Sequence, residues 1–287
     1  MKKKLSLVLA LALCLSLAAC GGGKTAQTAA PAAESKATAE TQKAADSDLS
    51  YIQGNGKLVI GYTVYEPMNY TDESGNFTGF DTELAQATCA QLGVTPEFVI
   101  INWDTKEVAL EAKDIDCIWN GLTLNAEREA NMACTVPYVK NAQVVVVKEG
   151  FDYQNTESLA GKTVCAEIGS AGEEQIKGSE DSPADSGLAK ADYVGKSVQT
   201  DCLMEVKAGT ADAAVLDMTL AKSMTGEGTN YDDLKIVDYL AQENYGVAFR
   251  KGSDARDAVN EIFAMFRDKD NGTLQSLADK YGLELAD

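Results

Sequence analysis

The sequence predicts an α/β protein in which helices cover sheets of parallel strands. Short apolar runs with the composition of strands alternate with segments that carry apolar residues at helical spacing. In chain order these alternating segments cover residues 57–64, 81–93, 96–102, 104–114 and 115–120. Such alternation is typical of a parallel sheet with covering helices. It resumes after residue 142, so we expect two α/β modules, roughly 51–141 and 142–240.

The second module begins with a strand at 142–150, which contains four consecutive valines. A strand, a turn and a helix follow over 161–176, and another strand ends at Asp217. Residues 234–253 have the pattern of two further strands. Two helices close the chain, and the apolar stripe of the first consists of Val259, Ile262, Phe263 and Phe266. The sequence alone would let these helices cover either module.

The first residues have the pattern of a secretory signal. Lysines at 2–4 precede an apolar run that is too short to span a bilayer comfortably. The segment Leu-Ala-Ala-Cys that ends at Cys20 resembles the lipobox of bacterial lipoproteins. This resemblance implies a lipoprotein signal peptide over 1–19, cleavage before Cys20 and lipidation of the Cys20 thiol. An ordinary signal peptide with an incidental cysteine is the alternative.

Residues 20–48 are rich in Ala, Thr, Gly, Lys and Glu, and they contain no aromatic residue. Such a segment cannot bury enough apolar surface to offset its chain entropy, so we expect a disordered tether. With a lipidated Cys20, the tether would hold the protein at the outer face of the bacterial cell membrane. From about Leu49 the composition is that of a globular protein, and the remaining chain is long enough to bury a large core.

The charge and composition exclude several classes of function. The chain has 44 acidic and 25 basic side chains, a net charge of −19, which repels nucleic acid and anionic lipid. It has no histidine, so Ser-His and Cys-His nucleophiles are absent. The cysteines after Cys20 are widely spaced and include no C-x-x-C pair, so no zinc site is expected. We expect them to be small core residues, with one internal disulfide left possible.

Three polar segments follow the ends of predicted strands, the edge at which parallel α/β sheets bind ligands. Arg128 lies on a helix start capped by Asn125, and its guanidinium could hold a carboxylate or pair with a nearby glutamate. Ser170 opens a helix whose N–H groups suit an anion, or it forms an ordinary capping box with Glu173. Asp217 could receive an ammonium group or cap the next helix.

The three segments are more informative together than singly. Arg128 and Ser170 offer two sites for a carboxylate, and Asp217 offers one for an ammonium group. This combination fits the head group of a free amino acid held in a cleft between two lobes.

A series of short motifs from about residue 51 to the end occurs in the order and spacing of one family. They are GFDTELAQA at 79–87, WD at 103–104, GLTLNAER at 121–128, VPY at 136–138, GSAGE at 169–173, ADAAVLD at 211–217 and YGVAFRKGS at 245–253. With these motifs the chain resembles the family 3 extracellular solute-binding proteins of amino-acid ABC transporters. Each motif is weak alone, but chance does not explain so many in order.

The resemblance implies the type II periplasmic-binding-protein fold, an α/β fold of two lobes. Each lobe would have a parallel-type sheet, and two crossovers near 139–143 and 239–245 would act as hinges. Lobe 1 would comprise 49–141 and 243–287, and lobe 2 would comprise 142–242. The implied function is that of a monomeric, lipid-anchored receptor that delivers a polar L-amino acid to ABC permease subunits, without a cofactor, a metal or a catalytic residue.

The ligand-binding positions of the family carry over onto matching residues of this chain. By the resemblance, Arg128 would bind the ligand α-carboxylate. Thr123, Ser170 and the N–H of Ala171 would help it.

Other matching positions would bind the rest of the ligand. Asp217 and the carbonyl of Gly121 would receive the α-ammonium group. Tyr65 would pack on the ligand side chain, or it covers the core. Asn120 would face the ligand, because side chains alternate in direction along a strand.

The chain departs from the family around the side-chain pocket, where the first loop is one residue short. The identity of the amino acid therefore stays open. Glu66 and Glu107 could favour a cationic side chain, although each could equally be a solvated glutamate. Two other functions suit the same scaffold: a cleft enzyme such as a lyase or dehydratase, which would need a carboxylate such as Glu173 as its acid or base, and a ligand-sensing module.

Overall fold

The computed structural model describes residues 47–179 and 182–287. The predicted signal peptide, the lipidated Cys20 and the tether up to residue 46 lie outside the described residues. The tether was predicted to extend to residue 48. Ser47 accepts a hydrogen bond from the Ser50 N–H and caps helix α2 (Asp48–Asn55), so this helix begins within the predicted range. Within the described part of the chain, no helix is both long enough and apolar enough to cross a bilayer.

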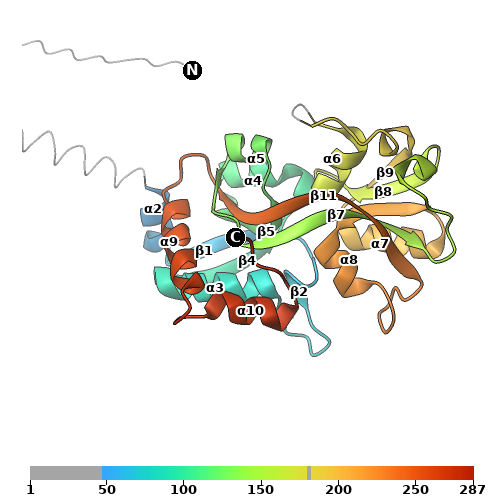
Figure 1. The fold of residues 1–287 in the computed structure, drawn as a ribbon. Helices are drawn as coiled ribbons and strands as arrows, with labels where there is room; N and C mark the ends of the chain where they lie inside the picture. The colour runs from blue at the N-terminus through green and yellow to red at the C-terminus, as the bar shows by residue number, and fades with distance from the viewer. Residues whose placement is uncertain (1–46, 180–181) are drawn as a thin grey trace, which may run out of the picture. The chain divides into compact units, whose positions relative to one another are not determined.

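A nine-stranded sheet forms the centre of the described chain (Figure 1). In order across the sheet its strands are β4 (Thr95–Ile100), β1 (Lys57–Tyr62), β5 (Cys117–Thr123), β11 (Leu234–Phe249), β7 (Val139–Lys148), β10 (Ala213–Asp217), β8 (Thr163–Glu167) and β9 (Asp192–Lys196), with β6 (Ala133–Cys134) paired to β11 outside this path. The strands β2 (Tyr70–Thr71) and β3 (Phe77–Thr78) form a separate hairpin.

Parallel pairing occupies both ends of this sheet. At one end β1 pairs in parallel with β4 and β5, and at the other β8 pairs in parallel with β9 and β10. Between them the long strands β7 and β11 run antiparallel, side by side (Figure 1). These two strands join the two predicted parallel groups into one continuous sheet.

Strand β11 corrects one expectation. Residues 234–253 were expected to form two strands, but Leu234–Phe249 forms a single strand of 16 residues. Its register against β7 shifts between Ile236 and Asp238, and again between Tyr239 and Ala241. Such bulges insert extra residues without ending a strand, so the apolar pattern is interrupted although the pairing continues.

Helices cover both parallel groups. They are α3 (Phe80–Leu92), α4 (Lys106–Glu111), α5 (Ala126–Asn131), α6 (Ala171–Lys177), α7 (Gln199–Ala208), α8 (Met218–Met224), α9 (Ala255–Arg267) and α10 (Thr273–Tyr281). The predicted caps are confirmed, since Asn125 and Ser170 each accept a hydrogen bond from the backbone N–H three residues on. The helix expected over 104–114 is shorter, because a 3-10 turn, Trp103–Thr105, precedes α4.

Strand β5 lies between β1 of the first parallel group and the antiparallel β11, and it is buried on both faces. Trp119 packs in the cluster that includes residues of α3 and α9, whereas Ile118 and Leu122 pack with Leu110 of α4. Successive side chains of a strand point to opposite faces, so a strand covered on both sides needs a continuous apolar run. Packing on both faces therefore fixes the orientation of the last residues of β5, Asn120 to Thr123.

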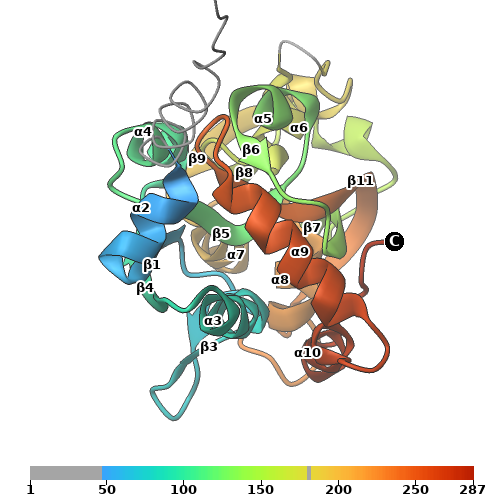
Figure 2. The ribbon, with the colours of Figure 1, turned by 90° about the vertical axis from the view of Figure 1, so that its left-hand side faces the viewer.

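The closing helices α9 and α10 pack on the first parallel group. Phe263 of α9 lies edge-on to Trp119, with 5.7 Å between ring centroids. Tyr281 of α10 lies edge-on to Phe80 of α3 at 6.4 Å. Figure 2 shows α9 and α10 beside α3. The structure thus resolves which module the C-terminal helices cover.

The cysteines of the described residues are free thiols, so the disulfide that the sequence left possible is not formed. They are Cys89, Cys117, Cys134, Cys165 and Cys202. Most of them are buried, as expected for small core residues, and burial raises the pKa of Cys89 to about 12. Such a thiol stays protonated and unreactive at neutral pH.

Candidate functional site

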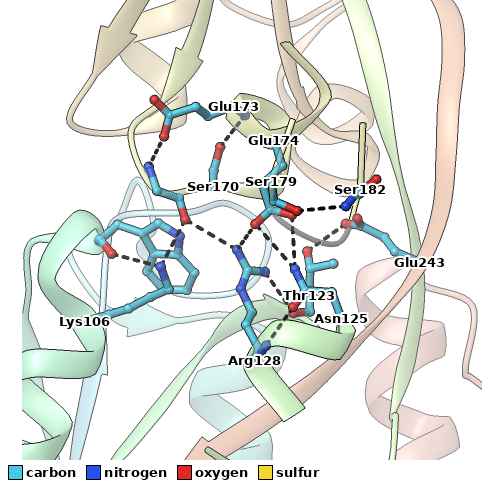
Figure 3. A network of polar contacts seen from close by, with 12 residues as sticks. Lys106, Thr123, Asn125, Arg128, Ser170, Glu173, Glu174, Ser179, Ser182 and Glu243 are labelled. Atoms are coloured by element: carbon cyan, nitrogen blue, oxygen red, sulfur yellow. Dashed lines mark hydrogen bonds and ion pairs between the residues drawn. The ribbon is translucent and has the colours of Figure 1, made fainter. Parts of the chain in front are cut away.

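Arg128 points into the protein rather than into solvent, with only 4% of its surface exposed. The cap at Asn125 starts α5 and fixes the position from which the side chain leaves the backbone. Its guanidinium donates to the carbonyl of Thr123 at 2.8 Å and to the carbonyl of Gly169 at 3.4 Å. Figure 3 shows it directed toward the turn that precedes α6. A buried guanidinium is costly unless charged partners compensate it.

That compensation comes from Glu174 of α6. One Arg128 nitrogen lies 3.1 Å from Glu174 Oε1, and the Asn125 amide donates to Glu174 Oε2 at 3.1 Å (Figure 3). A pair with a nearby glutamate was one of the two sequence interpretations of Arg128. The glutamate is distant in sequence, however, so the pair links two elements that the resemblance assigns to different lobes.

A second cation, Lys106, lies in the same region. Its ammonium group donates to the carbonyls of Trp103 at 3.2 Å and Gly169 at 3.0 Å. Burial, and then the charge of Arg128, lower the pKa of Lys106 to about 8. Residues of α4, α5 and α6, including Lys106, Arg128 and Glu174, line a cavity of about 220 Å³. The lining also includes Asp104, Glu107, Glu127 and Glu173, so the two cations lie among carboxylates.

Ser170 borders that cavity, and Ala171 follows it as the first residue of α6. The Ser170 hydroxyl accepts from the N–H of Glu173 at 3.2 Å. The predicted capping box is only half formed, because Glu173 accepts from the N–H of Gly169 at 2.7 Å rather than from that of Ser170. Glu173 also pairs with Lys177 at 2.6 Å. Ser170 thus acts as a helix cap that lines the same cavity as Arg128.

Asp217 forms part of an acidic end of the site. Its Oδ1 accepts from Asn141 at 2.8 Å and from Gln143 at 2.6 Å, and its Oδ2 accepts from Gln199. Asp217 occupies the N-cap position of α8, as one interpretation predicted, but its side chain makes no cap bond to that helix. Burial raises the pKa of its carboxyl group.

Glu243 of β11 completes the acidic end. Its Oε1 accepts from Asn141 at 2.7 Å and from Gln143 at 2.9 Å, the same two amides that bind Asp217. The Thr123 hydroxyl donates to Glu243 Oε1 at 2.9 Å (Figure 3). Thr123 therefore contacts both ends, with its carbonyl on Arg128 and its hydroxyl on Glu243.

The remaining predicted residues lie in or behind the loop that follows β1. Tyr65 is buried, and its hydroxyl hydrogen-bonds with those of Thr219 and Tyr245. Gly121 has φ +57° and packs so closely that an added Cβ would meet the Tyr65 ring at 2.7 Å. Its N–H donates to Asp81 at 2.7 Å.

Asn120 is buried, and neighbouring groups engage both ends of its amide. Its oxygen accepts from the N–H and hydroxyl of Thr63 at 3.0 and 2.9 Å. Its nitrogen donates to the Thr63 carbonyl at 2.9 Å and to Asn69 at 2.8 Å. In this arrangement Asn120 anchors the loop that carries Tyr65. Of the glutamates suggested for a cationic side chain, Glu66 accepts from Ser223 at 2.9 Å, and Glu107 lines the cavity beside Arg128.

Several site residues escaped the sequence interpretation. They are Lys106, Asn141, Gln143, Glu174, Gln199 and Glu243. One usable signal existed: Asn141 and Gln143 lie two residues apart at the start of an apolar strand, so both point to one face. No such pattern marks Glu174 or Glu243, because the partners of each are distant in sequence.

Comparisons with known proteins agree on one family. The model of the bacterial extracellular solute-binding proteins, family 3, matches residues 58–284. The arginine-binding extracellular protein ArtP of Bacillus subtilis is 29% identical to this chain, over 98% of each protein.

Two solved structures are similar in fold. The P235GK mutant of ArgBP from T. maritima is 32% identical, with a TM-score of 0.72 and coverage of 82% of this chain and 99% of that one. The ancestral amino acid-binding protein AncCDT-1, a precursor of cyclohexadienyl dehydratase, is 29% identical, with a TM-score of 0.71 and coverage of 82% and 99%.

Proposed function

The chain belongs to the bacterial extracellular solute-binding proteins, family 3, and on this basis we propose that it captures a polar L-amino acid and delivers it to an ABC permease. The binding role agrees with that of its relatives, one of which is an arginine-binding extracellular protein. The amino acid would lie between two lobes, 49–141 plus 243–287 and 142–242. The lobes would close around it by bending β7 and β11 near 139–143 and 239–245.

The polarity of the site carries this proposal. Arg128 and Lys106 supply two cations at one end, where Glu174 already pairs with Arg128, and Asp217 and Glu243 supply two carboxyl groups at the other. Thr123 contacts both ends. A zwitterion laid along Thr123 would place its carboxylate at Arg128 and its ammonium group at Asp217. Each charge-assisted hydrogen bond contributes about 1.5–3 kcal/mol net, and a few of them suffice for a micromolar Kd, about −8 kcal/mol.

The other predicted residues have supporting roles in this account. Ser170 and the Ala171 N–H complete the carboxylate site, and the Gly121 carbonyl adds an acceptor for the ammonium group. Tyr65 packs on the ligand side chain from the loop that Asn120 anchors.

Delivery would begin at the membrane surface. A lipidated Cys20 would hold the receptor on the outer face of the cell membrane, and the tether over 20–48 would let it reach the permease. Replacing Cys20 with Ser should release the protein from the membrane into the soluble fraction of the cell. Retention of the variant on membranes would contradict the lipid anchor.

An enzymatic function finds less support in the site. One solved relative is a precursor of a dehydratase, and Glu173 is the carboxylate that such chemistry would use here. Burial alone would raise the pKa of Glu173, but hydrogen bonds from Lys177 and the Gly169 N–H outweigh burial and lower it. A carboxyl group with a lowered pKa is a poor general acid at neutral pH.

A thermal-shift screen tests the proposed function. The mature protein is heated with each of the twenty amino acids, cystine and ornithine, each at millimolar concentration. A ligand that binds only the folded state raises the melting temperature, so we expect a rise with at least one of them. A flat response to all of them would overturn the amino-acid function. Chemical change of the bound amino acid, followed by mass spectrometry, would indicate the enzyme instead.

A further inference from the structure

Asp217 and Glu243 form a carboxylate pair that shares its hydrogen-bond donors. The Asn141 amide nitrogen lies 2.8 Å from Asp217 Oδ1 and 2.7 Å from Glu243 Oε1. The Gln143 amide nitrogen lies 2.6 and 2.9 Å from the same two oxygens. Two carboxylates that face the same nitrogens repel one another unless one is protonated or a cation joins them.

The described side chains supply no such cation. Among the ion pairs of the described residues, none includes Asp217, Glu243 or the nearby Glu167. Gln143 is 1% exposed, and its amide oxygen accepts no hydrogen bond. Its orientation is fixed, since its nitrogen binds both carboxylates. Buried acceptors thus exceed buried donors at this end of the site, and a donor-rich cation would satisfy them.

The raised pKa values of these buried carboxyl groups also favour a cationic ligand. Burial, followed by repulsion from Asp217, raises the pKa of Glu243 to about 8. The same two causes raise the pKa of Glu167 to about 8. A positive ligand near these groups would offset both causes and let them ionise.

We infer that the acidic end selects amino acids with a cationic side chain, and that Glu243 receives this second positive charge. The inference rests on the proposed function, because it assigns the α-ammonium group to Asp217. An amino acid with a neutral side chain brings one cation to two carboxylates, whereas arginine, lysine or ornithine brings two. Glu243 is thereby the residue that determines specificity.

The surroundings of Glu243 also bear on the length of the ligand side chain. Glu243 borders a hollow of about 800 Å³, but the lining of this hollow includes Lys140 and Lys222 as well as Asn141 and Tyr239. A cationic group that ends at Glu243 would avoid these two lysines, whereas one that extended farther would approach them. We therefore expect the second positive charge to lie at Glu243 itself.

A simpler arrangement competes with this inference: a single α-ammonium group could bridge both carboxylates. In that case Glu243 would strengthen the binding of every amino acid equally. Arginine and citrulline separate the two arrangements, because citrulline has nearly the same shape with a neutral urea in place of the guanidinium group.

The test is a calorimetric titration of wild-type protein, Glu243→Gln and Glu149→Gln with both ligands. Glu149 is exposed at the end of β7, so its variant makes the same chemical change away from the site. Wild-type and Glu149→Gln proteins should bind arginine about tenfold or more tightly than citrulline, the value of one hydrogen bond to a charged group. In Glu243→Gln this ratio should fall toward one.

Two other outcomes would overturn the inference and leave the proposed function standing. Equal loss of both ligands in Glu243→Gln would show that Glu243 only supports the ammonium group. Equal affinity of the wild-type protein for arginine and citrulline would also overturn the inference. This comparison does not depend on whether the Glu243→Gln variant folds. Failure of every amino acid to bind would instead overturn the proposed function.

Proton release gives a second readout on the wild-type protein. Arginine binding should release more protons than citrulline binding near pH 7, because the second cation ionises Glu243. Calorimetry in two buffers with different ionisation enthalpies measures the difference. The titratable groups that face Glu243 are Asp217 of β10 and the hydroxyls of Tyr65 and Tyr245, with Glu167 of β8 beyond Asp217. Equal proton release with both ligands would contradict the inference.

Discussion

The guanidinium of Arg128 lies 3.1 Å from the carboxylate of Glu174, which reaches it from α6. The two side chains are 5% and 25% exposed, so the pair is largely shielded from water. Glu174 thereby occupies one of the contacts that we assign to the ligand carboxylate. A ligand carboxylate would then compete with Glu174 for the same guanidinium, which in this structure links α5 to α6.

Replacing Glu174 with Gln should strengthen ligand binding and weaken the unliganded fold. The ligand carboxylate would no longer compete with an internal one, so Kd should fall. The free protein would lose a charged hydrogen bond and about 1–3 kcal/mol of unfolding free energy. Urea denaturation and calorimetry measure the two effects. Glu157→Gln, which breaks an exposed pair with Lys190, is the matched control and should change neither. Weaker binding by Glu174→Gln would show that Glu174 supports the ligand instead.

Replacing Gly121 with Ala should destabilise the protein by more than backbone strain alone. Gly121 has φ +57°, and the added Cβ would lie 2.7 Å from the Tyr65 ring and 3.2 Å from the Tyr245 ring. Gly209→Ala is the control, because Gly209 has φ +77° and nothing within 4 Å of an added Cβ. We expect about 1 kcal/mol of lost unfolding free energy at Gly209 and about 2–4 kcal/mol at Gly121. Equal losses of unfolding free energy in the two variants would mean that the Tyr65 loop moves away from the added Cβ without a loss of stability.

The stability of the unliganded protein should fall as pH rises from 5 to 8. Burial raises the pKa of Asp81 from 3.8 to about 7, despite hydrogen bonds from the Gly121 N–H and the Tyr138 hydroxyl. Between these values the folded state binds more protons than the unfolded state, so the free energy of unfolding decreases with pH. For Asp81 alone the decrease between pH 5 and pH 8 is at most about 3 kcal/mol.

Asp81→Asn tests this origin of the pH dependence. Asparagine can still accept both hydrogen bonds but does not titrate, so the decrease between pH 5 and pH 8 should become smaller. It should not vanish, because the raised pKa values of Glu167 and Glu243 act in the same direction. Urea denaturation at both pH values measures the change. An undiminished decrease in the variant would remove Asp81 from the explanation.

The sequence predicted those parts of the fold that depend on local patterns. The caps at Asn125 and Ser170 and the strand that ends at Asp217 are confirmed because each follows from a few neighbouring residues. The single strand β11 was predicted as two, because its continuity depends on pairing with β7 rather than on its own sequence. Local periodicity cannot report such distant pairing.

The site was predictable only in part for the same reason. Arg128 lies in the capped helix that follows β5, and Asp217 ends β10, so local patterns in the sequence mark both positions. Their partners Glu174 and Glu243 are more than twenty residues away in sequence. Periodicity is judged over windows of roughly 11–18 residues, so it cannot relate these partners to one another. Which carboxylate a buried guanidinium meets is decided by the packing of β5, β11 and α6.

The most direct test of the central claim uses the amino acid that the thermal-shift screen identifies, together with the amine formed by removing its carboxylate. Wild-type protein should bind the amino acid about 100-fold more tightly than the amine, because Arg128 contacts only the former through charge. In Arg128→Gln calorimetry should find this difference abolished, while the partly exposed control Arg256→Gln keeps it. A wild-type protein that bound both ligands equally, or an unchanged difference in Arg128→Gln, would contradict the assignment of Arg128 to the ligand carboxylate.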